Sequence, residues 1–306
     1  MAVTHRPTPS PLETVGRRVR VIVNPVSGRG RHVRKLRRLA KILRALKFRP
    51  EFFVTRGPGD AARYAVEAHP DTALLLAVGG DGTVNEVANG NIENKVPIAL
   101  LPAGTGNILQ KEFRLPRRVR EACRLALEGQ VRWIDALRVN GRLSLLVTSA
   151  GFDSRIALEI HRNRKGTLRQ RDYAFYIAKE VLTHKYNPID VYADGELLAE
   201  GAAHVIVGNA RSYGGPFEIA CHASPFDGKM DVVALMAKGR LPLLRYLWCA
   251  VRGNLDRCPG VIYRQVKRLE LRGRADIPYQ IDGDPAGFLP VKIEVLPRAI
   301  PVVVSG

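Results

Sequence analysis

Residues 72–90 read TALLLAVGGDGTVNEVANG, an apolar run that ends in two glycines, an aspartate and a third glycine. The run is typical of a buried β-strand, and Val84, Val87 and Ala88 have the spacing of a short helix. Glycine allows tight turns and a close approach of the backbone to a ligand, so two interpretations are open. The segment 79–82 is either a tight strand-to-helix turn or a phosphate-binding loop in which Asp81 binds a metal.

Strands alternate with helices from residue 17 to residue 135, and the loops NPVSGRG (24–30) and LPAGTGN (101–107) also follow strand-like runs. This alternation predicts an α/β domain whose parallel sheet has helices on both faces. All the glycine-rich loops then lie at the carboxyl ends of the strands, the edge at which open α/β sheets bind ligands.

Phosphate oxygens bind well to successive backbone N–H groups near a helix N-terminus, and Ser27, Thr83 and Thr105 add hydroxyl donors. Three such loops at one edge favour a nucleotide site. The GxxxxGK(S/T) pattern and a GxGxxG after a strand are absent from the sequence, so neither a P-loop ATPase nor a dinucleotide-binding unit is indicated. A carboxylate beside polyphosphate is repelled unless a cation lies between them, so Asp81 indicates Mg²⁺, held through water.

The second half of the chain consists of short alternating runs separated by Asn-Gly and Asp-Gly turns, which predicts a β-sandwich. Helical patterns interrupt it at 154–186 and 241–253. We expect a disordered leader over 1–16, a nucleotide-binding α/β domain over 17–135 and an all-β, lipid-binding sandwich over 136–306. Whether the final strand returns to the first domain stays open.

The composition indicates the partners. The net charge is +19, yet no helix-turn-helix, zinc finger or RNP-like motif accompanies it, so no specific nucleic acid is expected. The four cysteines form no CxxC pair, no signal peptide begins the chain and no apolar run could span a bilayer. We expect a cytoplasmic protein.

Basic residues gather over 31–49 and 161–185. The basic face of the first segment is either an ordinary solvated face or a docking surface for anionic lipid. In the second segment, Tyr173, Phe175 and Tyr176 either contact a membrane or pack on the sandwich. The docking interpretation predicts peripheral association with an anionic membrane.

The loops NPVSGRG, GGDGTVNEVANG and LPAGTGN, followed by GGPFEIACHASPFDGKMDVV and YQIDGDPAGFLPVKIEVLPR, resemble the diacylglycerol kinase catalytic domain family of lipid kinases. The resemblance runs from about residue 19 to the C-terminus. GGDGT alone is shared with NAD kinases and phosphofructokinases, whereas NEVxNG and the late DG(E/D)P element belong to lipid kinases. The resemblance implies an NAD-kinase-like first domain and transfer of the γ-phosphoryl of Mg-ATP to a hydroxyl of diacylglycerol or of a related lipid, of sphingoid or phosphatidylglycerol type.

The resemblance also assigns residues. It places ATP along Asn24, Pro25, Val26, Ser27, Gly28, Thr55, Gly80, Asp81, Gly82, Thr83, Val84, Asn85, Glu86 and Thr105. It implies a magnesium network that includes Asp81 and Asp135, and a structural magnesium site made by Ser224, Asp227 and Lys229. The family's catalytic base lies in a late DGE element, which here reads Asp282-Gly283-Asp284.

Two positions depart from the family pattern. Ile108 stands where many members have aspartate, and Asp284 replaces glutamate and shortens the base by one methylene. Either change could redirect or weaken activity, and the DGD element could also be a plain hairpin turn. The alternatives are an NAD-kinase-like phosphotransferase and a non-catalytic protein that binds nucleotide or lipid. A homodimer through the β half stays open.

Overall fold

The computed structural model describes residues 18–27, 32–45, 48–104, 106–116, 118–163, 170–183, 186–213 and 217–305. The expected leader over 1–16 lies outside these residues. The chain divides into two compact units. Unit 1 comprises the residues up to Ile134 together with those from Arg298 onward, and unit 2 is Asp135–Pro297.

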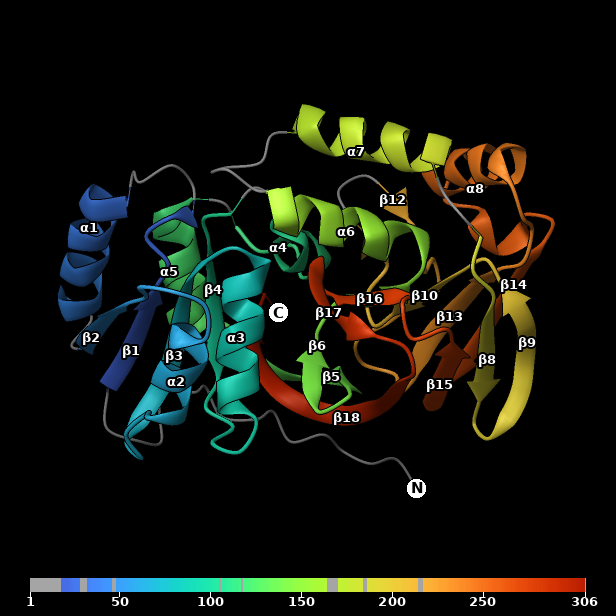
Figure 1. The fold of residues 1–306 in the computed structure, drawn as a ribbon. Coiled ribbons are helices and arrows are strands. Elements are labelled where there is room, and N and C mark those ends of the chain that lie inside the picture. The colour runs from blue at the N-terminus through green and yellow to red at the C-terminus, as the bar shows by residue number, and fades with distance from the viewer. Residues whose placement is uncertain are drawn as a thin grey trace, which may run out of the picture. The chain divides into compact units, whose positions relative to one another are not determined.

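Strands and helices alternate in unit 1 (Figure 1). Its elements are β1 (Arg18–Val23), α1 (His32–Ala45), β2 (Arg49–Val54), α2 (Asp60–Val66), β3 (Thr72–Gly79), α3 (Asp81–Asn91), β4 (Ile98–Pro102), α4 (Ile108–Glu112) and α5 (Val119–Glu128). The sheet has the order β2-β1-β3-β4, and each neighbouring pair is parallel. All eight residues of β3 are buried, as the apolar run requires of a central strand.

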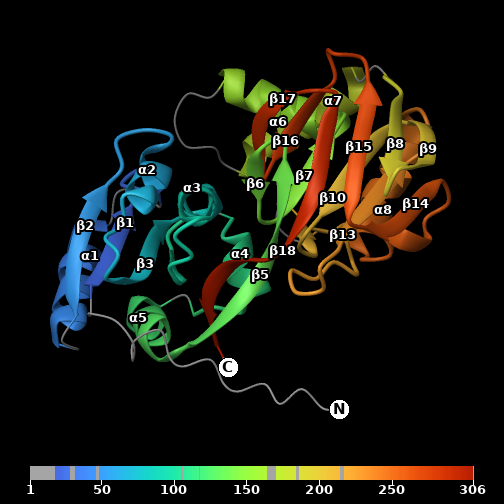
Figure 2. The same cartoon turned by 90° about the horizontal axis from the view of Figure 1, so that it is seen from below.

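Helices cover both faces of this sheet, and Figure 2 shows the strands between the two layers. Leu39 and Leu43 of α1 and Ala122 of α5 share one buried cluster with Val21 of β1 and Leu76 of β3. On the other face, α2 packs against α3. The predicted α/β architecture of the first half is confirmed.

The strand order creates a switch point between β1 and β3. The chain leaves β1 through α1 toward β2, and later leaves β3 through α3 toward β4, on the opposite side of β1. Loops that diverge in this way leave a crevice at the carboxyl ends of the strands, where open α/β sheets bind ligands. The 24–27 and 79–82 segments lie at this point.

Within its described residues, unit 2 contains a sandwich of two sheets, a separate pair of short strands, three α-helices and one 3-10 helix. Its elements are β5 (Gln130–Val139), β6 (Arg142–Ser144), β7 (Val147–Ala150), α6 (Phe152–Asn163), α7 (Gln170–Thr183), β8 (Ile189–Ala193), β9 (Glu196–Ala202), β10 (His204–Gly208), β11 (Ser212–Tyr213), β12 (Phe217–Glu218), β13 (Met230–Leu235), α8 (Arg240–Val251), the 3-10 helix η2 (Leu255–Arg257), β14 (Val261–Val266), β15 (Arg268–Gly273), β16 (Pro278–Ile281), β17 (Asp284–Phe288) and β18 (Val291–Val304). One sheet has the order β14-β13-β10-β7-β16-β17, and the other includes β18-β15-β8-β9. The predicted β-sandwich is confirmed.

The core of the sandwich consists of alternating apolar residues from both sheets, among them Val191, Val207, Val232 and Val291. Helix α6 packs on β7, β16 and β17, and α7 packs on α6 over a cluster made by Phe152, Ile156 and Ile160. Among the described residues, none of the helices combines the length and the apolar composition that a membrane-spanning segment needs.

Strand β18 serves both units. Its first part pairs with β15, where Ile293 lies opposite Leu269. Its last part lies beside β4 in unit 1, with Val302 opposite Ile98, and Val303 is 1% exposed in the core of that unit. Strand β5 also passes from unit 1 into unit 2, because the division falls between Ile134 and Asp135.

Gly90 sets the distance between α2 and α3. A Cβ atom at Gly90 would lie 2.1 Å from the backbone oxygen of Ala62, a contact that requires the helices to separate. We expect Gly90→Ala to lower the free energy of unfolding by about 2 kcal/mol, although alanine is the better helix former. Urea unfolding measures the change.

The matched control is Gly57→Ala, since a Cβ at Gly57 would meet nothing within 4 Å. That variant is expected to stay within about 0.5 kcal/mol of the parent protein. Equal stability of the two variants would contradict the close packing of α2 on α3.

Candidate active site

The loop after β1 is tied to the loop after β3. The backbone N–H of Asn24 donates to the oxygen of Val78 at 3.0 Å, and the Asn24 side chain donates through Nδ2 to Oγ1 of Thr83 at 3.1 Å. The other side-chain atom, Oδ1, accepts the N–H of Val26 at 3.1 Å and shapes the turn. Asn24 therefore links two of the three predicted phosphate-binding loops by hydrogen bonds.

The loop after β4 packs directly on the loop after β3. A Cβ at Gly104 would lie 2.6 Å from Cα of Gly80, and one at Gly80 would lie 3.2 Å from Cα of Gly104. The N–H of Ala103 also donates to the oxygen of Gly79 at 2.8 Å. These two glycines are thus required by loop-on-loop packing, which brings the second and third loops together.

Asp81 joins the same two loops through its carboxylate. Oδ2 accepts the N–H of Ile108 and Oδ1 accepts the N–H of Leu109, both at 3.0 Å. These are the first two amides of α4, so the carboxylate also caps that short helix. A carboxylate has about four lone-pair positions, so two remain for a water or a cation. This arrangement fits an Mg²⁺ ion held through water.

The N-terminus of α3 offers donors for an anion. Within the described part of the chain, the amides of Asp81 and Gly82 have no hydrogen-bond acceptor, whereas those of Thr83 and Val84 donate to the oxygen of Gly80. Free first-turn amides together with the helix dipole favour a negatively charged ligand.

The remaining residues assigned to ATP differ in exposure. Pro25 and Val26 are exposed, Ser27 and Asn85 are partly buried, and Thr55 is buried.

Val84 of α3 is buried, and Glu86 accepts the N–H of Ala61 at 3.2 Å, so the Glu86 side chain contacts the start of α2. Gly28 and Thr105 lie outside the described residues.

In unit 2, Asp135 contacts the turn that carries the predicted structural magnesium site. Asp135 is fully buried; its N–H donates to the oxygen of Pro225 at 2.7 Å, and its Oδ2 accepts the N–H of Gly228 at 2.6 Å. Asp227 is exposed and accepts the N–H of Lys229 at 3.0 Å. Ser224, which is partly buried, lies on the same turn. Oxygen donors on one turn suit a hard cation such as Mg²⁺.

Asp282 is held by four donors. Its Oδ1 accepts from Oγ of Ser144 at 2.6 Å and from the amides of Leu146 and Val147, both at 3.0 Å, and Oδ2 accepts the amide of Leu145 at 2.9 Å. Burial raises the pKa of Asp282, and these hydrogen bonds act in the opposite direction. Its lone pairs are occupied by donors of the 144–147 segment, so this carboxylate holds the β16–β17 turn against that segment.

Asp284 has a different environment. It is exposed at the start of β17, and none of the described residues forms a hydrogen bond or ion pair with its carboxylate. The residues between β16 and β17 are Asp282 and Gly283, with φ angles of 50° and 94°, as a tight two-residue hairpin requires. The turn therefore fixes Asp282 inside and leaves the side chain of Asp284 free.

A buried polar network, which the sequence analysis missed, supports this turn. Ser149 donates to Asp153 at 2.6 Å and accepts from Nε2 of Gln280 at 2.8 Å, and Oε1 of Gln280 accepts the N–H of Gly283 at 2.6 Å. The hydroxyl of Tyr213 also donates to Asp153. A signal was present, because GFDSR places an aspartate and a serine at the start of a helix directly after a strand. The partners of Ser149 and Asp153, Tyr213 and Gln280, lie far away in the sequence, so the signal did not reveal the network.

Comparison with known proteins agrees with this architecture. The diacylglycerol kinase catalytic domain matches residues 18–139, and the YegS C-terminal NAD kinase beta sandwich-like domain matches residues 146–304. A diacylglycerol kinase of Bacillus subtilis (strain 168) is 27% identical over 293 residues, covering 94% of this chain and 96% of the relative. One from Staphylococcus aureus (strain MRSA252) is 26% identical over 291 residues, covering 94% and 92%.

A solved structure has the same fold. The crystal structure of a diacylglycerol kinase from Bacillus anthracis str. Sterne superposes with a TM-score of 0.73 at 21% identity, over 94% of this chain and 97% of that one. The two domain matches account for most of the chain, in the order in which the two units occur. The chain belongs to the diacylglycerol kinase catalytic domain family.

Proposed function

We propose that this protein is an ATP-dependent lipid kinase, which transfers the γ-phosphoryl group of Mg-ATP to a hydroxyl of diacylglycerol or a related lipid. Family membership supports the broader statement that the chain is a lipid kinase. The observation that carries the nucleotide assignment is the junction of three glycine-rich loops at the switch point, where the free amides of Asp81 and Gly82 face the ligand edge.

The residues divide the work between nucleotide and metal. The amides at the start of α3 bind phosphate oxygens, and Asn24 and Thr83 keep the first two loops in register. Asp81 would hold Mg²⁺ through water, and Asp227 with the carbonyls of Ser224 and Lys229 would hold a second, structural ion. Bound Mg²⁺ neutralises charge on the transferred phosphoryl group.

Asp284 is the proposed general base. A base must reach the hydroxyl proton of the acceptor, so it needs an unoccupied oxygen. The exposed carboxylate of Asp284 meets this requirement, whereas Asp282 is occupied by Ser144 and three amides. Asp282 is therefore a positioning residue, which holds the turn from which Asp284 projects.

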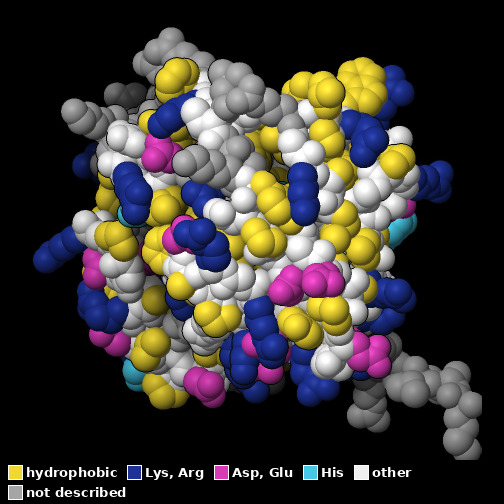
Figure 3. Space-filling view, turned by 45° about the vertical axis from the view of Figure 1, so that its right-hand side comes forward, with side chains coloured by type: hydrophobic (Ala, Val, Ile, Leu, Met, Phe, Trp, Pro, Cys, Tyr) yellow, Lys and Arg dark blue, Asp and Glu magenta, His cyan; other side chains and the backbone are white. Residues whose placement is uncertain are grey.

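Helix α8 supports association with an anionic bilayer. Leu241, Leu244, Trp248 and Val251 lie along it at helical spacing and are between 52% and 81% exposed. Arg252 stacks on Trp248 at 4.5 Å from the ring centroid, so a cation flanks the apolar row. Figure 3 shows hydrophobic and basic side chains lying together on the surface. Apolar side chains flanked by arginine match a membrane surface with negative headgroups.

The two basic segments expected to dock on lipid, 31–49 and 161–185, differ in which of their side chains are exposed. Arg37, Arg38, Lys41 and Arg44 of α1 are exposed, and the side chains of residues 31–35 and Lys47 lie outside the described set. Phe175 of α7 is 65% exposed, whereas Tyr176 packs on helix α6. The side chain of Tyr173 is not among those described.

Transfer of radiolabelled phosphate from ATP tests the proposed function. The acceptors are diacylglycerol, sphingoid base, ceramide, phosphatidylglycerol, undecaprenol and NAD. Labelled lipid is the expected product. Labelled NAD alone would establish an NAD-kinase-like enzyme, and no product despite bound ATP would establish a non-catalytic protein.

Asp81→Asn is expected to lower lipid phosphorylation by at least about 100-fold, because the charge opposite the metal is lost. One oxygen can still accept an amide of α4, so the loss of stability should be only about 1 kcal/mol. The assay measures labelled lipid, and thermal unfolding measures stability. The matched control is Asp71→Asn, an exposed aspartate of the same unit. Near-normal activity of Asp81→Asn would contradict the metal role.

Asp284→Asn is expected to lower kcat by about 10² to 10⁴ with little effect on stability, since the side chain is exposed. Asp282→Asn is expected to lose roughly 2 kcal/mol of stability, because its amide nitrogen would face donors. Asp276→Asn, an exposed aspartate in the same unit, is the control. If Asp284→Asn stayed active while Asp282→Asn was stable but inactive, Asp282 would be the base and Asp284 would not.

Trp248→Ala is expected to weaken binding to vesicles containing anionic lipid by about tenfold, because an inserted ring is lost. Leu197→Ala, which removes an apolar side chain of β9 that is 52% exposed, should leave binding unchanged. Sedimentation with vesicles measures both, and binding should fall as ionic strength rises. Equal binding to neutral vesicles would rule out the electrostatic component.

A further inference from the structure

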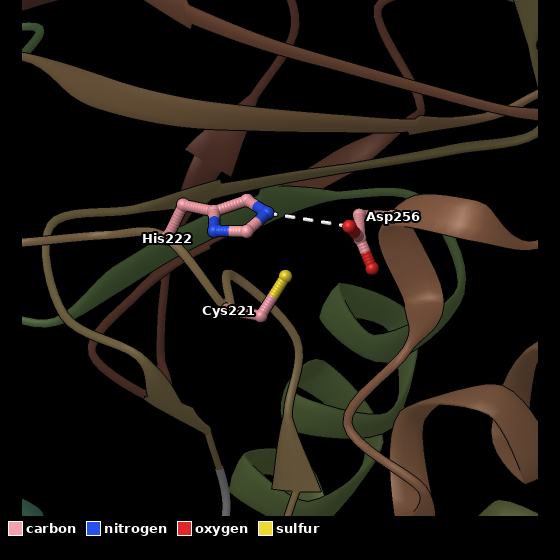
Figure 4. A group of neighbouring side chains, drawn as sticks. All are labelled: Cys221, His222 and Asp256. Atoms are coloured by element: carbon pink, nitrogen blue, oxygen red, sulfur yellow. Dashed lines mark hydrogen bonds and ion pairs between the residues drawn. The ribbon is translucent and has the colours of Figure 1, made fainter.

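Cys221, His222 and Asp256 form a cluster of metal-ligating side chains that the kinase reaction does not use. Each offers one ligand atom, and the three atoms lie within 4.8 Å of one another. Figure 4 shows the three side chains pointing into the same space. Cys221 and His222 belong to the turn before β13, and Asp256 belongs to η2, so the cluster joins two separate segments of unit 2.

The spacing of the donor atoms suits a tetrahedral ion. Nε2 of His222 lies 3.2 Å from Oδ2 of Asp256. Two ligands bound to one Zn²⁺ at 2.0–2.1 Å are separated by about 3.3 Å, so an ion can replace the proton that these groups share with little movement of either. Sγ of Cys221 lies within 4.8 Å of the other two donor atoms, so it has to move inward by up to roughly 1.3 Å to reach a tetrahedral position.

The residue packed against the cluster, Tyr263, holds the His222 ligand in place. The hydroxyl of Tyr263 accepts the backbone N–H of His222 at 3.1 Å and donates to Asp231 at 2.7 Å. The ring of Tyr263 also lies edge-on to the imidazole, with centroids 5.3 Å apart. These contacts orient His222 before any ion arrives.

We propose that Cys221, His222 and Asp256 bind a borderline-soft divalent cation, Zn²⁺ by its chemistry, with the fourth position open to water. Sulfur and nitrogen donors select Zn²⁺ over Mg²⁺, which prefers oxygen. The ion would tie the turn before β13 to η2. This site uses other residues and other donor types than the oxygen-rich turn of Ser224, Asp227 and Lys229, and it does not depend on the proposed kinase activity.

Metal content of the full chain provides the test. After equilibration with micromolar Zn²⁺ in excess Mg²⁺ and gel filtration, one zinc ion per chain is expected. Cys221→Ser and His222→Ala should each weaken binding by at least about tenfold. The His222 side chain is 60% exposed, so its loss does not threaten the fold. With Co²⁺ as probe, a thiolate-to-metal absorption band should appear and should be missing in Cys221→Ser.

The controls remove the same donor types elsewhere. His161→Ala removes an exposed imidazole of α6. Cys249→Ser removes a thiol outside the cluster, whose Sγ lies 2.8 Å from Sγ of Cys258. Both controls should retain the ion. Absence of zinc from the parent protein, or unchanged zinc in His222→Ala, would overturn the proposal whether or not the chain proves to be a kinase.

Discussion

The contact between the Asp81 carboxylate and the first amides of α4 determines the form of the candidate nucleotide site. It joins the loop after β3 to the loop after β4 by two hydrogen bonds of 3.0 Å. The close approach of Gly80 and Gly104 is possible only when these loops are held together. Asn24 then connects the loop after β1 to the same assembly through Thr83. One charged group therefore organises three loops that are far apart in the sequence.

The isoleucine at position 108, where many family members have aspartate, is compatible with the contact between Asp81 and α4. What Asp81 requires from that position is a backbone N–H group, which isoleucine supplies as well as aspartate does. A second carboxylate at that position would add negative charge near Asp81. The local fold therefore does not need the acidic side chain that many family members have, and the local charge is less negative without it.

Much of the fold could be predicted because its signals are local. The buried run of β3, the helical spacing after it and the Asn-Gly and Asp-Gly turns are each properties of short segments. Site geometry was less predictable, because it depends on contacts between distant residues. The sequence left the base open between Asp282 and Asp284, and the contacts of Asp282 with Ser144 and the following amides are what support Asp284 as the proposed base. The network from Asp153 to Gln280 was missed for the same reason.

The route of β18 has a consequence for biosynthesis. Val302 pairs with β4 and Val303 lies in the core of unit 1, but both leave the ribosome after the whole of unit 2. During translation the outer edge of β4 stays unpaired while the sandwich is already able to fold, and an unpaired strand edge invites aggregation. Unit 1 is thus synthesised first but can be completed only after unit 2 has been made. A chain that stops before Arg298 would lack part of its first unit.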